Sequence, residues 1–314
     1  MTDTAVVLLN LGGPERLEDV GPFLSQLFAD RRIIRLGPAF LQRPLARLIA
    51  WRRTPKSRAS YQRIGGGSPL NRITRQQADA LAAALLPVPG MEVAVAMRYW
   101  QPRAQPVLAS LVSRGVRRII ALPLYPHYSR ATSGSSLEDL SEAAVSLLTA
   151  PSVTPIRSWA DHPAYIACLA RRIREGWERC GREGTALVYS AHSLPQSFID
   201  EGDPYLAELQ RSIAAVETVT GIKGRLCFQS RSGPVRWLAP STPETLHGLA
   251  AEGCRQVLVV PLSFVSDHVE TLGEIDIDYH RLAAELGMRL VRTASFNAES
   301  DFIACLRDLV LAAL

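Results

Sequence analysis

Short apolar runs recur along the chain and predict strands that are buried on both faces. Each run has four or five residues and is rich in Val, Ile, Leu and Ala, with almost no polar interruption. Such runs are typical of parallel strands that helices cover on both sides of the sheet. The predicted strands are Ala5–Leu9, Val93–Met97, Arg118–Leu122, Ala186–Tyr189 and Val257–Pro261.

Longer segments between these runs have apolar residues at helical spacing. The predicted helices are Thr74–Leu86, Pro106–Ser113, Ser136–Leu148, Pro163–Arg179, Pro204–Val219, Thr242–Glu252 and Glu299–Leu314. Strands that alternate with helices indicate βαβ units and a mostly parallel sheet. The pattern therefore predicts an α/β fold.

Two stretches of the chain, residues 115–124 and 253–262, share a pattern. Four of their ten positions are identical, and five of the other six are apolar in both. A second pair, residues 4–14 and 185–195, is similar at a different offset. The repetition favours two similar α/β lobes with unequal insertions; the alternative is that buried βα units simply resemble one another. Ligands of open α/β sheets bind beyond the carboxyl ends of strands, so the residues that follow each strand are the candidates for chemistry.

Composition agrees with a large folded core. The chain has 314 residues, of which 47% are hydrophobic and 21% charged, enough for one large domain or two lobes. The N-terminus lacks a secretory signal, and no apolar run approaches the roughly 18 to 20 residues that span a bilayer. We therefore expect a cytoplasmic protein. The cysteines are scattered, which favours free thiols over an iron–sulfur cluster; they are Cys168, Cys180, Cys227, Cys254 and Cys305.

Positive charge is concentrated in residues 31–63. The basic residues there are Arg31, Arg32, Arg35, Arg43, Arg47, Arg52, Arg53, Lys56, Arg58 and Arg63, and the apolar residues among them are Phe40, Leu41, Leu45, Leu48, Ile49 and Trp51. One interpretation is a solvated, arginine-rich helix with an ordinary core face. The other is a surface that meets an anionic membrane or an acidic substrate. We expect no nucleic-acid partner, since no recognition motif accompanies the charge.

Two glycine clusters invite a nucleotide-binding interpretation that their spacing does not support. Gly12-Gly13 follows the first predicted strand, and Gly65-Gly66-Gly67 lies further on. Neither fits the dinucleotide pattern G-x-G-x-x-G, and neither is followed by the Lys-Ser/Thr of a phosphate-binding loop. Close backbone packing or a tight turn explains the clusters better.

Candidate binding residues follow two other predicted strands. Arg98, Tyr99 and Trp100 come after Val93–Met97 and combine a cation with two aromatic rings, a set that can bind a flat anionic ligand by stacking and ion pairing. A packed aromatic pair beside an exposed arginine is the alternative. His192 follows Ala186–Tyr189; a neutral imidazole there could accept a proton near pH 7 or bind a metal.

The segment after Val257–Pro261 is rich in acidic residues. Glu270, Glu274 and Asp278 are four residues apart and would share one face of a helix, where like charges are destabilising unless a cation or a proton compensates. Asp267 and His268 add donors for a divalent metal. The spacing is not that of a zincin, and no cysteine is near, so a permanent structural zinc is not expected.

Eight motifs, in order, resemble those of the ferrochelatases and span most of the chain. They are Asn10–Pro14, Tyr61–Pro69, Met97-Arg98-Tyr99, Leu122–Pro126, Ser190–Pro195, Gln229–Pro234, Trp237–Pro240 and Asp267–Leu272. Each is weak alone, but eight in the family's order are specific. The resemblance implies insertion of Fe²⁺ into a free-base porphyrin, with release of two protons, to form haem.

The resemblance also implies a fold of two similar Rossmann-like lobes with the active site in a central cleft. We expect the lobes over residues 1–150 and 151–314, with an exchange between the last helix of the first lobe and the C-terminal segment kept as an option. His192 and Glu270 are then the catalytic and metal-handling pair, and Glu274 with Asp278 form a path for metal or protons. The residues that line or support the porphyrin pocket are Leu11, Arg98, Tyr99, Trp237, Phe264, Asp267 and His268.

The chain departs from some family members at a few positions. Leu11 stands where some have Met, and Phe228 where animal enzymes have Trp. The cysteine-bearing C-terminal extension of animal enzymes has no counterpart, so an iron–sulfur cluster is not expected. No permanent cofactor is implied, and Fe²⁺ is a substrate. Protoporphyrin IX is the favoured porphyrin; the alternatives are coproporphyrin III, another metal such as cobalt, or a haem or metal carrier without turnover.

Overall fold

The computed structural model describes residues 3–181, 183–231 and 233–314. Its chain forms two compact units. The first lobe comprises the chain up to Ser158 together with Asn297–Leu314, and the second lobe comprises Trp159–Phe296. Each lobe is built around one four-stranded sheet.

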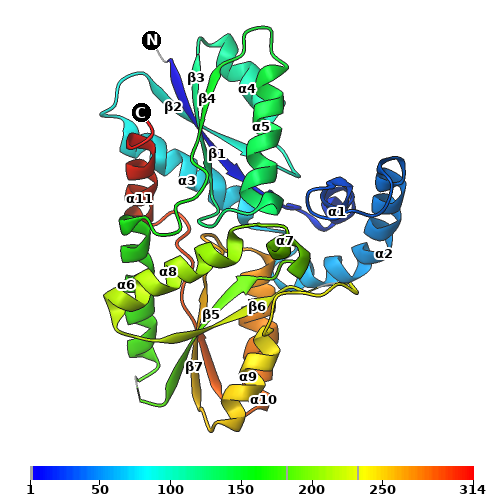
Figure 1. Ribbon diagram of the computed structural model, residues 1–314. Coiled ribbons are helices and arrows are strands. Elements are labelled where there is room, and N and C mark those ends of the chain that lie inside the picture. The colour runs from blue at the N-terminus through cyan, green and yellow to red at the C-terminus, as the bar shows by residue number, and fades with distance from the viewer. Residues whose placement is uncertain (1–2, 182, 232) are drawn as a thin grey trace. The chain divides into compact units, whose positions relative to one another are not determined.

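The first lobe contains a parallel sheet in the order β2-β1-β3-β4 (Figure 1). Its strands are β1 (Thr4–Asn10), β2 (Met91–Met97), β3 (Arg118–Pro123) and β4 (Ser152–Pro155), and its helices are α1 (Val20–Ala29), α2 (Gln42–Arg63), α3 (Leu70–Leu85), α4 (Ala104–Ser113), α5 (Ser135–Val145) and α11 (Ser300–Leu311). A short π-helix, Arg130–Gly134, precedes α5. Every residue of β1 is buried because strands flank it and helices cover both faces.

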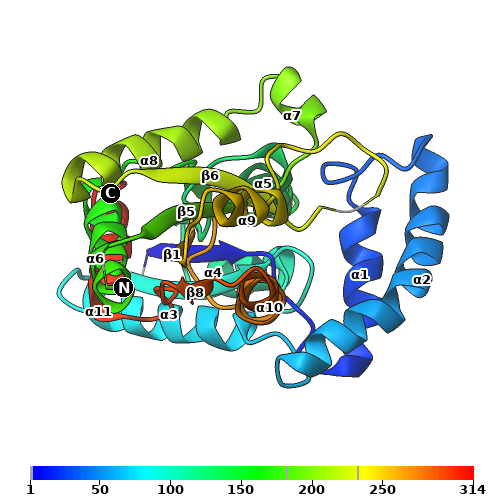
Figure 2. The ribbon, with the colours of Figure 1, turned by 90° about the horizontal axis from the view of Figure 1, so that it is seen from below.

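Alternating side chains of β1 face different helices. Ala5, Val7 and Leu9 share a core with residues of α4 and α5. α3 lies against β1 and β2, and α11 packs beside α3, as the two ribbon views show (Figures 1 and 2). The helices cover the faces of the sheet, and the loops that follow β1 and β3 lie at the carboxyl ends of these strands.

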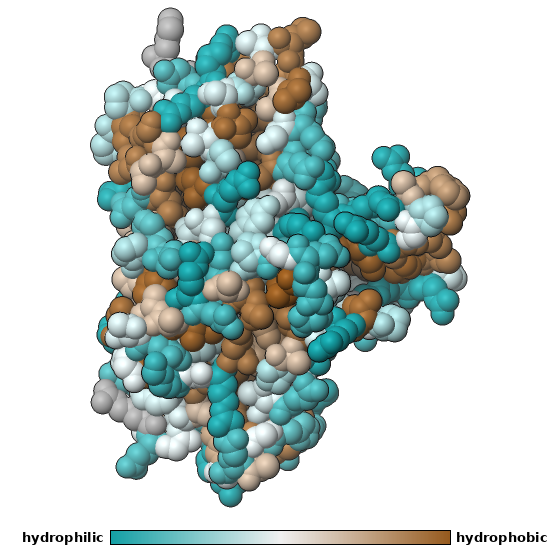
Figure 3. Space-filling view, in the orientation of Figure 1, coloured by the Kyte–Doolittle hydropathy of each residue, from teal (hydrophilic) through white to brown (hydrophobic). Residues whose placement is uncertain are grey.

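Residues 42–63 of the basic segment form α2, a 22-residue helix that packs against α1, and Phe40 lies in a short 3₁₀ turn, Ala39–Leu41, that precedes it. Its buried side includes Ala46 and Ala50, whereas Leu48 and Trp51 are exposed. Apolar and hydrophilic side chains lie side by side over α1 and α2 (Figure 3). The segment thus has the core face of the first interpretation and the exposed apolar residues that the second requires.

The second lobe repeats the arrangement, with a parallel sheet in the order β6-β5-β7-β8. Its strands are β5 (Thr185–His192), β6 (Gly224–Gln229), β7 (Gln256–Pro261) and β8 (Arg289–Arg292), and its helices are α6 (Pro163–Arg179), α7 (Gln196–Asp200), α8 (Tyr205–Thr220), α9 (Thr242–Ala251) and α10 (His280–Glu285). A π-helix, η4 (Glu270–Tyr279), joins β7 to α10. Val188, Val257 and Val259 pack in one core with α9 and α10.

The two sheets confirm the predicted fold class of two similar, mostly parallel lobes flanked by helices. The stretches that resemble each other in sequence become β3 and β7, the third strand of each sheet. In both lobes the loop after that strand enters a π-helix. The second pair of similar stretches becomes β1 and β5, the second strand of each sheet.

The lobe boundaries differ from residues 1–150 and 151–314. Residues 152–155 form β4, which pairs with β3 from Arg118↔Ser152 to Ala121↔Pro155 and therefore belongs to the first lobe. The C-terminal helix also belongs there, because α11 packs on α3 and Arg118 donates hydrogen bonds to the carbonyls of Ala313 and Leu314. The first lobe is thus discontinuous in sequence.

Candidate active site

His192 is the last residue of β5, at the carboxyl end of the second lobe's sheet. Its backbone N–H donates to Ser263 Oγ at 2.8 Å, and the Tyr205 hydroxyl donates to its carbonyl at 3.0 Å. These contacts fix the backbone, while the imidazole remains 36% exposed. A histidine held in this way can meet a ligand without losing its position.

Glu270 and Glu274 lie on the π-helix η4 rather than on an α-helix. A π-helix closes its hydrogen bonds from residue i to i+5; the element is rare and is frequently found at functional sites. Glu270 Oε2 lies 2.8 Å from His192 Nδ1. The structure therefore brings together a histidine and a carboxylate that are 78 residues apart in the chain.

The contact between His192 and Glu270 determines which imidazole nitrogen is available. An ionised carboxylate can only accept a hydrogen bond, so Nδ1 carries the hydrogen and donates to Glu270. The lone pair of the neutral ring then resides on Nε2, which has no hydrogen-bond partner among the residues that the structure describes. Nε2 is therefore the atom that can take up a proton.

The charges at the site separate the pKa values of its groups. Burial opposes a charge on His192, but the Glu270 carboxylate outweighs it and raises the pKa of the imidazole. Burial also opposes ionisation of Glu270, yet His192 holds the pKa of that carboxyl well below its usual range. Burial, with the charge of Glu270, raises the pKa of Glu274 to about 7. Glu270 is thus held ionised while Glu274 can carry a proton near neutral pH.

Ser230 lies between the two carboxylates. Its Oγ is 3.0 Å from Glu270 Oε2 and 2.8 Å from Glu274 Oε2. A hydroxyl has a single hydrogen, so it donates to one of them at a time. Ser230 also has a φ of 65°, in the left-handed region that costs a non-glycine residue about 1 kcal/mol. The surrounding chain maintains this conformation at the point where the hydroxyl meets both acids.

Phe264 and His268 lie next to the pair formed by His192 and Glu270. The Phe264 ring centroid lies 4.3 Å from that of His268 and 6.4 Å from that of His192. His268 Nδ1 is 3.1 Å from the Ser266 carbonyl, which can only accept, so Nδ1 carries the hydrogen. Burial lowers the pKa of His268, and its unprotonated Nε2 lies 3.9 Å from Glu270 Oε2. Nε2 and Oε2 are two electron-pair donors that face each other.

Arg292, the last residue of β8, holds the π-helix η4 in place through Asp276. It grips Asp276 with two hydrogen bonds, Nε to Oδ1 at 2.7 Å and Nη2 to Oδ2 at 2.9 Å. Its Nη1 lies 3.2 Å from Asp267 Oδ1, which also accepts from Ser295 Oγ at 2.7 Å. Arg292 therefore ties the loop before the π-helix to the middle of it. Asp267 has this anchoring role in the structure.

Two further residues of the second lobe lie less centrally. Asp278, near the end of η4, is 37% exposed and lies 3.9 Å from Arg281 Nη2. Trp237 is half-buried and forms a β-bridge with Pro195, three residues after His192. Of the three acidic residues spaced four apart, Glu270 and Glu274 therefore lie close together, whereas Asp278 is partly exposed to solvent.

The first-lobe residues Arg98 and Tyr99 are engaged by Asp30. Arg98 Nη2 and the Tyr99 hydroxyl each donate to Asp30 Oδ2 at 2.7 Å, and Arg98 Nη1 donates to Asp139 at 2.9 Å. Tyr99 is only 2% exposed. Asp30 therefore engages both groups in this structure, which favours the packed alternative for Tyr99. The half-buried Leu11 lies beside them, its carbonyl accepting from the Tyr99 N–H at 2.9 Å.

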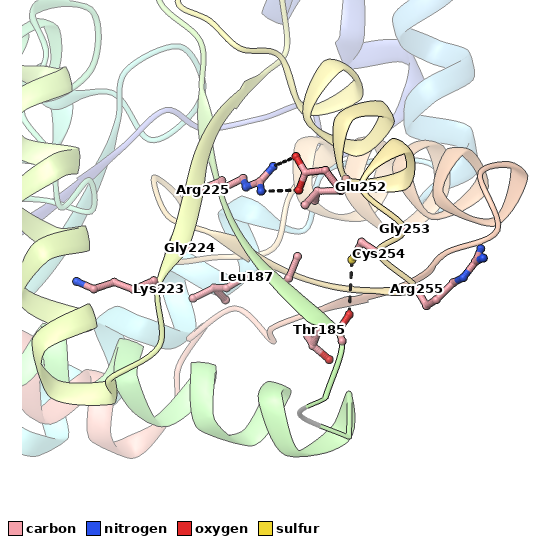
Figure 4. A pocket seen from close by; sticks show the side chains of 12 residues that line it. Thr185, Leu187, Lys223, Gly224, Arg225, Glu252, Gly253, Cys254 and Arg255 are labelled. Atoms are coloured by element: carbon pink, nitrogen blue, oxygen red, sulfur yellow. Dashed lines mark hydrogen bonds and ion pairs between the residues drawn. The ribbon is translucent and has the colours of Figure 1, made fainter.

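A hollow of about 590 Å³ lies at the opposite, amino-terminal end of the second lobe's strands (Figure 4). It is lined by the first residues of β5 and β6, and two of the three cations that line it, Arg225 and Lys223, already have partners. Arg225 makes a two-pronged ion pair with Glu252, at 2.7 and 2.6 Å, and Lys223 pairs with Glu217 at 2.9 Å. Ligands of α/β sheets bind at the other end of the strands, so this hollow is not the candidate site.

Several functional residues were not singled out from the sequence. Ser230 follows β6, and Arg292 ends β8, and neither strand is among those predicted. Because candidate residues were sought after predicted strands, Ser230 and Arg292 were not among them. Asp30 follows α1 and has no neighbouring motif. A polar pair such as Gln229-Ser230 after the partly apolar run Leu226–Phe228 was the available signal.

Comparison with known proteins points to one family. The sequence model of the ferrochelatase family matches residues 3–314. The chain is 54% identical over 308 residues to the ferrochelatase of Desulfotalea psychrophila, covering 98% of this chain and 96% of the relative. It is 50% identical over 310 residues to the ferrochelatase of Geotalea daltonii, covering 98% and 97%.

Solved structures with similar folds include chelatases. SirB from Bacillus subtilis with Fe³⁺ has a TM-score of 0.60 at 11% identity, covering 99% of this chain and 95% of that chain. CbiX, described as the terminal enzyme for biosynthesis of sirohaem in denitrifying bacteria, has a TM-score of 0.51 at 17% identity, covering 99% of each chain. At these identities the likeness establishes the fold.

Proposed function

The chain belongs to the ferrochelatase family, whose members insert ferrous iron into a porphyrin to form haem, and we propose that His192 and Glu270 perform the proton and metal handling. The reaction takes Fe²⁺ and a free-base porphyrin and releases the metalloporphyrin and the two pyrrole N–H protons. The observation that carries the proposal is the 2.8 Å contact between His192 Nδ1 and Glu270 Oε2.

In the proposed mechanism His192 Nε2 removes the pyrrole protons. Glu270 keeps the hydrogen on Nδ1 and stabilises the imidazolium that forms, as an orienting carboxylate does for other catalytic histidines. The raised pKa of His192, caused by the Glu270 carboxylate, makes the imidazole a stronger base. The imidazolium can then pass its Nδ1 hydrogen to the carboxylates of η4, which leaves a neutral ring with its hydrogen on Nε2. That ring has to return to the Nδ1–H form before Nε2 accepts the second pyrrole proton.

Glu274 is proposed to receive the proton through Ser230. The Ser230 hydroxyl touches both carboxylates, and the pKa of Glu274 near 7 allows it to hold a proton and release it again. Asp278, which is partly exposed, is the proposed exit toward solvent or the entry for metal. Carboxylate oxygens bind Fe²⁺ weakly enough to pass it on, and Glu270 with His192 or His268 supplies the donors nearest the reaction.

The remaining predicted pocket residues receive different proposed roles. Phe264 and Trp237 offer aromatic surface to the porphyrin, and Leu11 offers an apolar contact. Asp267 supports the π-helix through Arg292. Arg98 and Tyr99 support the first lobe through Asp30 and do not touch the ring. No resident cofactor is part of the proposal.

Arg292→Lys should lower kcat about tenfold and leave KM for the porphyrin nearly unchanged. An ammonium group cannot reproduce the two-pronged bond to Asp276, so η4 would hold Glu270 and Glu274 less well. The matched control is Arg225→Lys, which loosens an equally two-pronged pair with Glu252 at the hollow of Figure 4. Steady-state kinetics on both variants, with melting curves, check this prediction. Equal losses in the two variants would contradict a positioning role for Arg292.

The porphyrin is proposed to be protoporphyrin IX, with coproporphyrin III as the alternative. Mixing the protein with each porphyrin and anaerobic Fe²⁺ should quench the fluorescence of protoporphyrin faster, because iron porphyrins do not fluoresce. A higher kcat/KM for coproporphyrin would reverse the assignment. Binding of either porphyrin without turnover would indicate a carrier, and faster insertion of Co²⁺ than Fe²⁺ would indicate a different metal.

We also propose that residues 31–63 contact a membrane surface from one side. Over residues 3–181, 183–231 and 233–314, no helix combines the length and the apolar character needed to cross a bilayer. Phe40 is 77% exposed and Trp51 75% exposed, and basic residues surround both. Exposed aromatic side chains among basic ones are typical of segments that lie at a lipid–water interface.

A further inference from the structure

A pocket of about 560 Å³ in the first lobe is lined largely by arginine side chains. It lies among the end of α1, the start of α2 and the loop after β2. The arginines that line it are Arg31, Arg32, Arg43, Arg47, Arg98 and Arg103. Asp30 is the single carboxylate among the described lining residues. Such a lining favours an anionic ligand.

Acidic partners already engage the inner arginines. Arg98 pairs with Asp30 at 2.7 Å and with Asp139 at 2.9 Å. Asp139 also lies 3.3 Å from Arg103, and Arg32 pairs with Glu138 and Glu142. These arginines form the rigid inner wall of the pocket.

Arg43 and Arg47 are different. Both are exposed, and neither has a hydrogen bond or ion pair with any residue in the described part of the chain. They lie one turn apart on α2, where two like charges destabilise a helix by roughly 0.2 to 0.5 kcal/mol. An anion between them would remove that repulsion, and two guanidinium groups can grip the oxygens of one phosphate.

The exposed apolar residues of the segment adjoin this pair. Arg47 precedes Trp51 by one helical turn and Leu48 by one residue, and Arg43 follows Phe40 by three residues. Phe40, Leu48 and Trp51 are 77%, 51% and 75% exposed. Figure 3 shows apolar and hydrophilic surface together over α1 and α2. A ligand with a phosphate group and apolar chains could pair with the two arginines and contact the exposed apolar side chains at the same time.

We propose that the pocket formed by Arg43, Arg47 and the inner arginines binds the phosphate of an anionic phospholipid, while Phe40, Leu48 and Trp51 enter the lipid. This inference rests on the proposed membrane contact and gives it a specific headgroup site. The apolar residues are open on one side, as a bilayer surface requires, whereas a flat ring substrate needs cover on both faces. The arginine stems can lie along the apolar layer with their charged ends at the headgroups.

Vesicle sedimentation tests the site. The intact protein should bind vesicles of phosphatidylcholine mixed with phosphatidylglycerol and bind pure phosphatidylcholine much less. The double variant R43Q/R47Q should lose about tenfold more affinity than the control R52Q/K56Q. The control removes two exposed charges, also one turn apart, from the same helix but outside the pocket. Melting curves of both variants establish that the fold is retained.

The outcomes separate the headgroup site from membrane contact itself. Equal losses in the two double variants would overturn the pocket and leave a general electrostatic contact. Absence of vesicle binding by the intact protein would overturn both proposals. Competition by inorganic phosphate without preference for anionic vesicles would identify a soluble ligand and overturn the lipid assignment. An R43Q/R47Q variant with normal vesicle binding but a raised KM for porphyrin would assign the pocket to substrate carboxylates instead.

Discussion

Replacing His192 by alanine is expected to lower kcat for iron insertion by about 10²- to 10⁴-fold, the range over which a positioned general base acts. The variant removes Nε2, the atom proposed to take the pyrrole protons, and leaves the backbone contacts of residue 192 with Ser263 and Tyr205 in place. The fold should therefore persist. Fluorescence quenching of the porphyrin under anaerobic Fe²⁺ measures the rate.

The matched control is His247→Ala, which removes an exposed histidine of α9. Its rate should equal that of the unmodified protein. Added imidazole should restore part of the activity of His192→Ala, because a free base can occupy the vacated space, and should leave the control unchanged. Near-normal turnover of His192→Ala in a folded protein would show that another group removes the protons.

Glu270→Gln is expected to lower kcat/KM about a hundredfold and to shift its pH dependence. In the unmodified protein the Glu270 carboxylate raises the pKa of His192, so the base is protonated and inactive below that raised value. The amide removes the negative charge, and the pKa of His192 falls. The acid limb of the rate profile should therefore move to lower pH, even though the maximum rate is smaller.

Measurement of kcat/KM across the acid range checks both effects. Glu285→Gln is the control, since Glu285 is an exposed carboxylate of α10, 3.8 Å from Arg281. Its profile should match that of the unmodified protein. An acid limb that stays in place or moves upward in Glu270→Gln would mean that Glu270 does not set the basicity of His192.

Most of the strands that the sequence predicted are inner strands, buried between neighbouring strands and helices. β1 and β3, with β5 and β7, are the inner strands, and their continuous apolar runs follow from burial on both faces. β4 and β8 have four residues each and lie at sheet edges, where several residues are exposed. Their sequences carry too few apolar positions to stand out from loops, so these two edge strands were missed, whereas the seven-residue edge strand β2 was predicted.

The candidate site was predictable in part. His192 follows a strand with a clear apolar pattern, and the acidic spacing after β7 identified Glu270 and Glu274. The expectation that these residues meet depended on the family resemblance, since no local pattern relates segments 78 residues apart. The polar pair Gln229-Ser230 was visible in the sequence, but the contact of Ser230 with both carboxylates could not be predicted, because it depends on a left-handed backbone and on the wider turn of a π-helix.

The discontinuous first lobe has a consequence for how the protein is made. Ribosomes deliver a chain from its N-terminus, and domains generally fold as units while synthesis continues. The second lobe, Trp159–Phe296, is one uninterrupted stretch and can fold as soon as it has emerged. The first lobe begins earlier but lacks α11 until translation has passed the whole second lobe and reached Leu311, so α3 has no cover from α11 until then. Of the two lobes, the one whose synthesis begins first is therefore the one that is completed last.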